Sequence, residues 1–279
     1  MRKVLFPALF LLTISIYSAH AQKIVVSDGQ KFELVTLTKM DMNMEAMGTP
    51  QKVITETTII AIVESKSHSD TDYVFVNTIK SMKLITDAAG QKINFDSDNK
   101  EDMNGPMAAG YKGIVGSTQE FRVNRQGKIL SMKTLGSDSG GIVNQTLEMF
   151  SLFTKGQPYP LLMAIPAKPV KKGESWVDST GSSDSLKTVY TYTLKENNGT
   201  DAIVGIKGLL KMAHKMAQQG MDIQMNLEGN ISGDAVYEKA NGLLKSNTSV
   251  SDMKGNMEVM GQSMPMTMVT TTTLNVRKI

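Results

Sequence analysis

The sequence predicts a mainly β protein with one large curved antiparallel sheet, or half-barrel, built from two pseudo-repeated halves, with two or three short helices packed on one face. Three observations lead to this fold class. Apolar and polar residues alternate over long stretches rich in Thr, Val, Ile and Met, which is the pattern of half-buried strands. Turn signals containing Gly or Pro separate these stretches. Short segments of the first half also recur in the second half, as expected of an internal repeat.

The first half of the chain predicts a meander of strands. Alternation over 31–44 and 53–64, around the turn sequence Met-Gly-Thr-Pro-Gln at 47–51, predicts a hairpin, because Gly permits a positive φ and Pro presets a turn. Residues 73–85 continue the meander. A second hairpin is predicted around Gly127, with its strands at 120–124 and 128–133.

Three segments have helical character. A short helix is predicted over 106–115, where Pro106 suits the first turn, Asn104 can cap it and Gly116 ends it. The spacing of apolar residues over 142–153 predicts an amphipathic helix. Residues 209–219 are ambiguous, and we favour a helix there over the alternative of a long strand.

A proline-rich connector separates the two halves. Four prolines between 156 and 169 exclude regular structure and favour an extended chain. The predicted organisation is therefore a signal peptide (1–21), a first β half (22–135), a helix and Pro-rich connector (136–165) and a second β half (166–279). Strands in the second half are predicted at 175–178, 186–194, 202–206, 222–231, 235–238, 243–250 and 266–276.

The repeat is clearest in two methionine-containing segments. Residues 43–48 read NMEAMG and residues 256–261 read NMEVMG, and a Thr-rich strand follows each. Weaker matches join 26–32 to 170–176 and 127–131 to 242–246. Because β hairpins share composition, such matches can also arise without a common origin. The first pair lies early in one half and late in the other, which a simple tandem copy does not explain.

The N-terminal 21 residues have the layout of a secretory signal peptide. Met1-Arg2-Lys3 is basic, an apolar run covers 4–16, and small residues precede Gln22. The apolar run of about 13 residues is shorter than the roughly 20 that a membrane-spanning helix requires. We therefore expect cleavage after Ala21, a periplasmic or secreted protein, and no transmembrane segment after signal removal.

The composition argues against several classes of protein. The chain has no cysteine, so neither a disulfide nor a lipid-modified cysteine is available. Its formal net charge is only +3, and no basic cluster marks a nucleic-acid surface. We therefore expect packing alone to hold the fold together, and no nucleic-acid partner.

Residues 166–176, with the sequence PAKPVKKGESW, resemble an exported Bacteroidetes family, domain of unknown function 6263. The resemblance extends to residues 43–48, to the Pro106 helix and to the strand pair around Gly127, and so covers nearly the whole mature chain. It implies no established activity and no catalytic residues. The long antiparallel strands are also similar, at the level of fold only, to the half-barrels of periplasmic lipoprotein carriers and lipid-binding lipoproteins.

Methionine is the compositional anomaly, with 21 residues in the chain. Spacing by two on a strand projects side chains from one face. The candidate ligand-binding residues are therefore Met40, Met42, Met44, Met264, Met266 and Met268. A flexible thioether surface suits varied hydrophobic ligands, soft thioethers select Cu(I) or Ag(I), and methionine also fills core gaps. A hydrophobic ligand would require a deep apolar cavity between sheet and helices, lined by Met, Leu and Ile.

Other candidates for chemistry favour structural roles. The acidic run over 96–102 lacks the glycine of a calcium loop and contains Lys100, so it predicts a solvated loop. His68 and His214 are too sparse for a metal centre or a catalytic triad and lie outside the Met clusters. Trp176 is expected to anchor its sheet. No catalytic residue, cofactor or metal ligand set is assigned.

The sequence therefore predicts a non-enzymatic exported envelope protein whose expected partner is a lipid or another small hydrophobic ligand. The alternative is a Met-rich protein of the periplasm that binds Cu(I) or Ag(I). Protein partners are not indicated.

Overall fold

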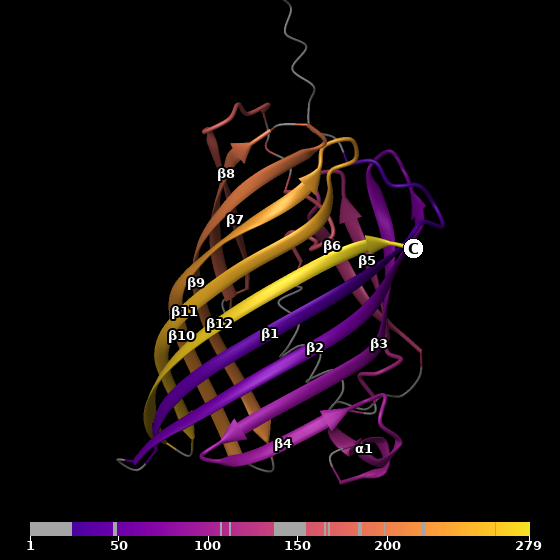
Figure 1. Cartoon of the computed structure of the whole chain (residues 1–279). Coiled ribbons are helices and arrows are strands. Elements are labelled where there is room, and N and C mark those ends of the chain that lie inside the picture. The colour runs from indigo at the N-terminus through magenta and orange to yellow at the C-terminus, as the bar shows by residue number, and fades with distance from the viewer. Residues whose placement is uncertain are drawn as a thin grey trace, which may run out of the picture.

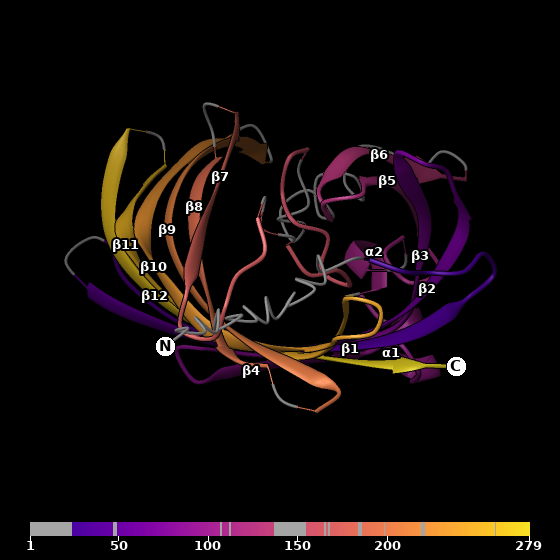
Figure 2. The same ribbon diagram turned by 90° about the horizontal axis from the view of Figure 1, so that it is seen from above.

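A computed structural model describes residues 24–46, 49–106, 108–111, 113–136, 155–164, 166, 168–183, 186–197, 199–218, 221–259 and 261–279. These residues form one 12-stranded antiparallel sheet, which is open and strongly curved (Figures 1 and 2). The mainly β, curved antiparallel fold expected from the sequence is thus confirmed.

The first half supplies six strands, and both of its predicted hairpins are present. The strands are β1 (Lys31–Ala46), β2 (Thr49–His68), β3 (Asp72–Ala88), β4 (Gln91–Asp96), β5 (Thr118–Asn124) and β6 (Ile129–Leu135). The strand β1 pairs with β2 over the whole length of β1, and β5 pairs with β6 across the Gly127 turn. The short strand β4 was not predicted. It pairs with the end of β3 beyond the segment where β3 pairs with β5.

The second half supplies the other six strands, which are longer than the sequence pattern suggests. They are β7 (Ser175–Ser183), β8 (Leu186–Glu196), β9 (Asp201–Gln218), β10 (Met221–Glu238), β11 (Leu243–Val259) and β12 (Gln262–Lys278). The favoured helix over 209–219 is wrong, because β9 continues to Gln218 and pairs with β10 throughout. Its Leu and Met spacing resembles a helical stripe, but pairing along the neighbouring strand overrides that local preference.

The first and last strands lie side by side at the centre of the sheet. The strand order is β6-β5-β3-β2-β1-β12-β11-β10-β9-β8-β7, with β4 attached to β3. Figure 1 shows β1 and β12 adjacent, with the first half on one side and the second half on the other. The matching segments 43–48 and 256–261 connect β1 to β2 and β11 to β12. Segment 43–48 thus includes the end of β1, and segment 256–261 leads into β12. These two strands are the central pair of the sheet.

Helices are a smaller part of the fold than predicted. Instead of two or three helices on one face, the described residues contain α1 (Lys100–Asn104) and the single turn α2 (Ala108–Tyr111), both between β4 and β5. Asn99 caps α1 by accepting a hydrogen bond from the Glu101 N–H at 2.9 Å. Asn104, the predicted cap of the helix over 106–115, is instead the last residue of α1. The amphipathic helix predicted over 142–153 lies outside the described residues.

One irregular segment with turns, 155–164, runs through the interior of the curved sheet (Figure 2). The Tyr159 ring stacks on Phe75 with ring centroids 4.9 Å apart. The Tyr159 N–H donates to the Gly127 carbonyl at 2.7 Å, and the Leu244 N–H donates to the Leu161 carbonyl at 2.9 Å. The segment therefore ties the β5–β6 turn to the β10–β11 turn and fills that part of the interior.

Gly127 allows this close approach. Its φ of +79° is in the left-handed region, and a Cβ at this position would lie 2.8 Å from the Met163 carbonyl oxygen. A side chain would therefore face both an unfavourable backbone conformation and a steric clash.

Candidate functional site

The most distinctive surface of the molecule is a cluster of thioether side chains on one face of five adjacent strands. Its apolar members pack together and are partly exposed, except for four that are buried. We call this set the methionine wall: Met42, Met44, Met212, Met225, Met253, Met257, Met266, Met268, Leu210, Leu227 and Ile231.

Strand register explains how the methionines meet. Met42 is directly opposite Met268, and Met44 is directly opposite Met266, where β1 pairs with β12. In the same way Met268 pairs with Met253 of β11. Directly opposed residues in an antiparallel sheet have their Cβ atoms about 5 Å apart, within contact range for long side chains.

The wall lies on the inner face of the sheet. Side chains alternate between faces along a strand, so Met42 and Met44 share their face with Phe32 and Leu34 of the same regular strand. Phe32 and Leu34 pack in the same core cluster as Tyr159, which belongs to the interior segment. At one end of the inner face, the interior segment therefore packs on the sheet. At the other end, the inner face forms the methionine wall.

The structure brings four of the six predicted methionines into the packed cluster, namely Met42, Met44, Met266 and Met268. Met40 has the same parity, but its cross-strand partners are Thr55 and Thr270. Met264 pairs with Met257. The sequence did not single out Met212, Met225, Met253 and Met257, because their proximity depends on the register of strands that are far apart in the chain.

Glycines shape the sheet beside the wall. A Cβ on Gly255 would lie 1.9 Å from the Asn226 carbonyl oxygen, and a Cβ on Gly229 would lie 2.0 Å from that of Asp252. Such distances exclude any side chain unless the backbone moves. These two glycines therefore let the backbones of β10 and β11 approach closely where a larger residue would keep the strands apart.

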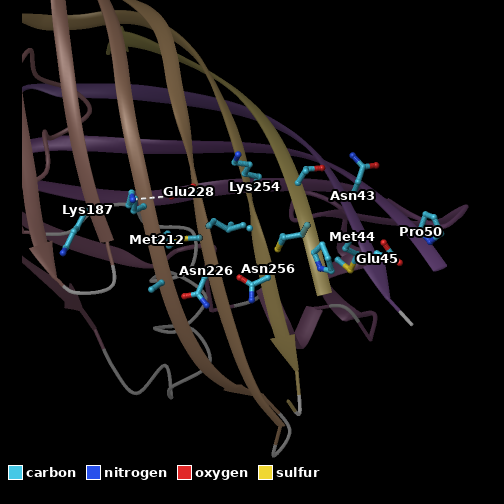
Figure 3. Close-up of a pocket in the computed structure, with 17 residues that line it drawn as sticks. Asn43, Met44, Glu45, Pro50, Lys187, Met212, Asn226, Glu228, Lys254 and Asn256 are labelled. Atoms are coloured by element: carbon cyan, nitrogen blue, oxygen red, sulfur yellow. Dashed lines mark ion pairs between the residues drawn. The ribbon is translucent and has the colours of Figure 1, made fainter. Parts of the chain in front are cut away.

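A pocket of about 910 Å³ crosses the sheet at the level of Met44, Met212 and Met266 (Figure 3). Its lining includes polar residues next to wall positions, such as Lys254 and Asn256, but most of the lining surface is apolar. Strand alternation places these polar residues on the face opposite the wall. The pocket is therefore an open groove, and not the deep apolar cavity expected between sheet and helices.

The two histidines have different surroundings. The Nδ1 atom of His68 lies 2.7 Å from Asp28 Oδ1 in a surface pair in which both side chains are about half exposed. His214 is the cross-strand partner of Met225. This pairing places the backbone of His214 beside a residue of the methionine wall, which the sequence does not reveal because it depends on the β9–β10 register.

The remaining candidates have structural roles. Trp176 stacks on Tyr192 with ring centroids 5.4 Å apart. Asp96 pairs with Lys83 at 2.8 Å, and Asp102 accepts a hydrogen bond from the Asp96 N–H, so the acidic run holds its own chain segment together. Within the described ranges, no group of three or more His, Cys, Asp or Glu side chains could hold a metal ion.

The fold and its inner surface define a class of protein: an open, curved antiparallel sheet that surrounds an interior chain segment and exposes an uncharged thioether wall. The chain belongs to the family of unknown function DUF6263, whose model matches residues 70–148 and 154–244, more than half of the sequence. None of the curated proteins matches it.

Solved structures show a likeness of fold. A structure of lipovitellin, titled for its lipid–protein interactions, has a TM-score of 0.54 at 10% identity, and the match covers 90% of this chain. It covers only 25% of the lipovitellin chain. A COG4313 outer membrane channel from Pseudomonas putida F1 has a TM-score of 0.23 at 6% identity, with 91% of this chain and 97% of that chain covered. Neither helix in the described part of this chain is long and apolar enough to cross a membrane.

Proposed function

We propose that this protein is a non-enzymatic exported envelope protein that binds a lipid chain or a similar hydrophobic ligand against the methionine wall. The observation that carries the proposal is the wall itself, an uncharged surface of partly exposed methionines on the inner face of an open sheet. Apolar surface that remains exposed costs free energy that a hydrophobic ligand would recover.

The choice of methionine supports a ligand of variable shape. Methionine has an unbranched, flexible side chain that adapts to irregular partners, whereas strands usually carry β-branched or aromatic residues. At the other end of the inner face, Phe, Tyr and Val fill the core around Tyr159. The sheet thus uses rigid residues where it packs on itself and adaptable residues where it meets the proposed ligand.

Two further observations agree with this function. The fold is similar to that of lipovitellin, a protein whose structure is titled for lipid–protein interactions. Export is supported by the signal-peptide layout of residues 1–21. Because the pocket at the level of Met44 and Met266 is open, we expect the ligand to lie along an open surface and to be partly covered.

Displacement of a fluorescent fatty acid, 11-(dansylamino)undecanoic acid, tests the proposal. The probe should brighten on binding, and alkanoic acids should displace it more strongly as they lengthen. Each additional methylene buried is worth about 0.8 kcal/mol, or about fourfold in affinity. Native mass spectrometry of protein purified from an envelope fraction should show bound lipid mass.

Two variants of β11 locate the site. Met257→Glu places a charge in the wall and should abolish probe binding, whereas Val250→Glu is the matched control. Val250 is 37% exposed and has the opposite strand parity, so its variant should bind normally. Both must retain the β circular dichroism spectrum. Absence of chain-length dependence, or equal loss in the two variants, would overturn the proposal.

A further inference from the structure

Three methionines form a continuous row across three neighbouring strands. Met225 of β10 is directly opposite Met257 of β11, and Met257 is directly opposite Met264 of β12. Strand alternation therefore projects all three side chains from the inner face. Their Cβ atoms are expected to be about 5 Å apart along the row, which lies within the reach of flexible methionine side chains.

The row differs from the other methionine contacts in its accessibility. A second row joins Met42, Met268 and Met253, but Met253 is only 3% exposed and is packed in the cluster. Each member of the Met225 row is instead partly exposed. The Met225 row also lies nearer the connections β9–β10 and β11–β12, at the end of the sheet away from the interior segment.

The chemistry of this row suits a soft monovalent metal ion. Thioether sulfur is a neutral, polarizable ligand that favours Cu(I) over the hard divalent ions, which prefer carboxylate and carbonyl oxygen. Three thioethers from adjacent strands can turn toward one point because each has three rotatable side-chain bonds. The residue that follows in the row on β9 is His214, the register partner of Met225.

We propose that Met225, Met257 and Met264 together bind one Cu(I) or Ag(I) ion through their sulfur atoms. The site shares Met225 and Met257 with the methionine wall, but metal binding does not require the proposed hydrophobic ligand. Thioethers carry no proton near neutral pH, unlike Cys or His ligands, so the affinity for Cu(I) should be the same at pH 6 and pH 8.

Replacement of methionine by leucine tests whether sulfur is required for metal binding. Leucine conserves the volume and apolar character of methionine but removes the sulfur. The triple variant M225L/M257L/M264L should therefore lose the metal while it keeps the β circular dichroism spectrum. The matched control is M40L, because Met40 lies on the same face and is partly exposed, but faces threonines on both neighbouring strands.

Anaerobic titration with Cu(I), in competition with bicinchoninate, measures the affinity, and native mass spectrometry with Ag(I) measures the stoichiometry. We expect one ion per chain, about a tenfold or greater loss of affinity in the triple variant and none in M40L. Three results would overturn the proposal: wild-type binding no tighter than about micromolar, triple-variant binding equal to wild type, or a steep loss of affinity on acidification, which would indicate imidazole coordination.

Discussion

Lys128 and Asp178 form an ion pair that joins the two ends of the open sheet. The Lys128 Nζ lies 2.5 Å from Asp178 Oδ1. Lys128 is in the turn between β5 and β6, and Asp178 is in β7, so the pair connects elements at opposite ends of the strand order. Asp178 is buried, and the side chain of Lys128 is one-third exposed. The pair therefore holds the curved sheet together on its open side.

We predict that Asp178→Asn lowers the free energy of unfolding by about 2 kcal/mol, because the Asn amide oxygen can still accept from Lys128 but carries no negative charge to pair with its ammonium group. Urea unfolding followed by circular dichroism measures the change. Lys245→Met is the control, since it breaks a more exposed pair with Asp201 and should cost less than about 1 kcal/mol. Equal losses in the two variants would contradict a special role for Asp178.

The close approach of β10 and β11 at Gly255 is expected to tolerate no side chain. Gly255→Ala should reduce the free energy of unfolding by about 3 kcal/mol or more, because the new Cβ would overlap the Asn226 carbonyl oxygen. Gly205→Ala is the comparison. Its nearest neighbour is the flexible end of Lys195, which can move aside, so thermal unfolding should change little. A stable Gly255→Ala protein would show that the close approach does not depend on glycine.

Alkaline pH should destabilise the fold through buried tyrosines. Burial raises the pKa of Tyr159, Tyr192 and Tyr237 well above the ordinary value of 10.0. The unfolded chain therefore releases these protons first, so the free energy of unfolding is unaffected below pH 10 and falls as the pH rises above it.

Each such tyrosine contributes up to about 1.4 kcal/mol per pH unit above the unfolded pKa. Urea unfolding between pH 9 and pH 11.5 should show this slope, and Tyr237→Phe should make it shallower. Absorbance at 295 nm should show these tyrosines ionising together with unfolding. Ionisation without unfolding would refute their burial.

Methionine oxidation should follow exposure within the wall. Hydrogen peroxide transfers one oxygen to a thioether sulfur and leaves water, and accessible residues react first. Met42, Met44 and Met268 should therefore form sulfoxide several-fold faster than Met253 and Met266, which are each 3% exposed. Peptide mass spectrometry after timed exposure measures the rates. The same rate at all five residues would mean that the buried Met253 and Met266 become accessible to peroxide through local opening of the sheet.

The sequence predicted the parts of the fold that depend on local pattern. Period-2 alternation identified β1, β2 and β3, and the turn at Gly127 identified the β5–β6 hairpin. Local pattern failed at β9, where apolar spacing suggested a helix and the two neighbouring strands impose an extended conformation. The strand β4 was missed because four of its six residues are polar or charged, and only the edge of β3 holds them in a strand.

The candidate site was predictable only in part, for the same physical reason. The spacing of Met40, Met42 and Met44 shows that they share a face, but the neighbours of that face depend on tertiary pairing. The contact between Met257 and Met225 requires the β10–β11 register, and the contact between Met42 and Met268 joins strands more than 200 residues apart.

The pairing of β1 with β12 at the centre of the sheet has a consequence for how the chain folds. Ribosomes make β1 first and β12 last, so the middle of the sheet stays incomplete until synthesis has reached the final strand. Until then β1 presents an unpaired, 16-residue edge with free backbone hydrogen-bonding groups. Closing so long a loop is slow and exposes the nascent chain to aggregation. We expect folding to depend on a holding chaperone until the C-terminal strand arrives.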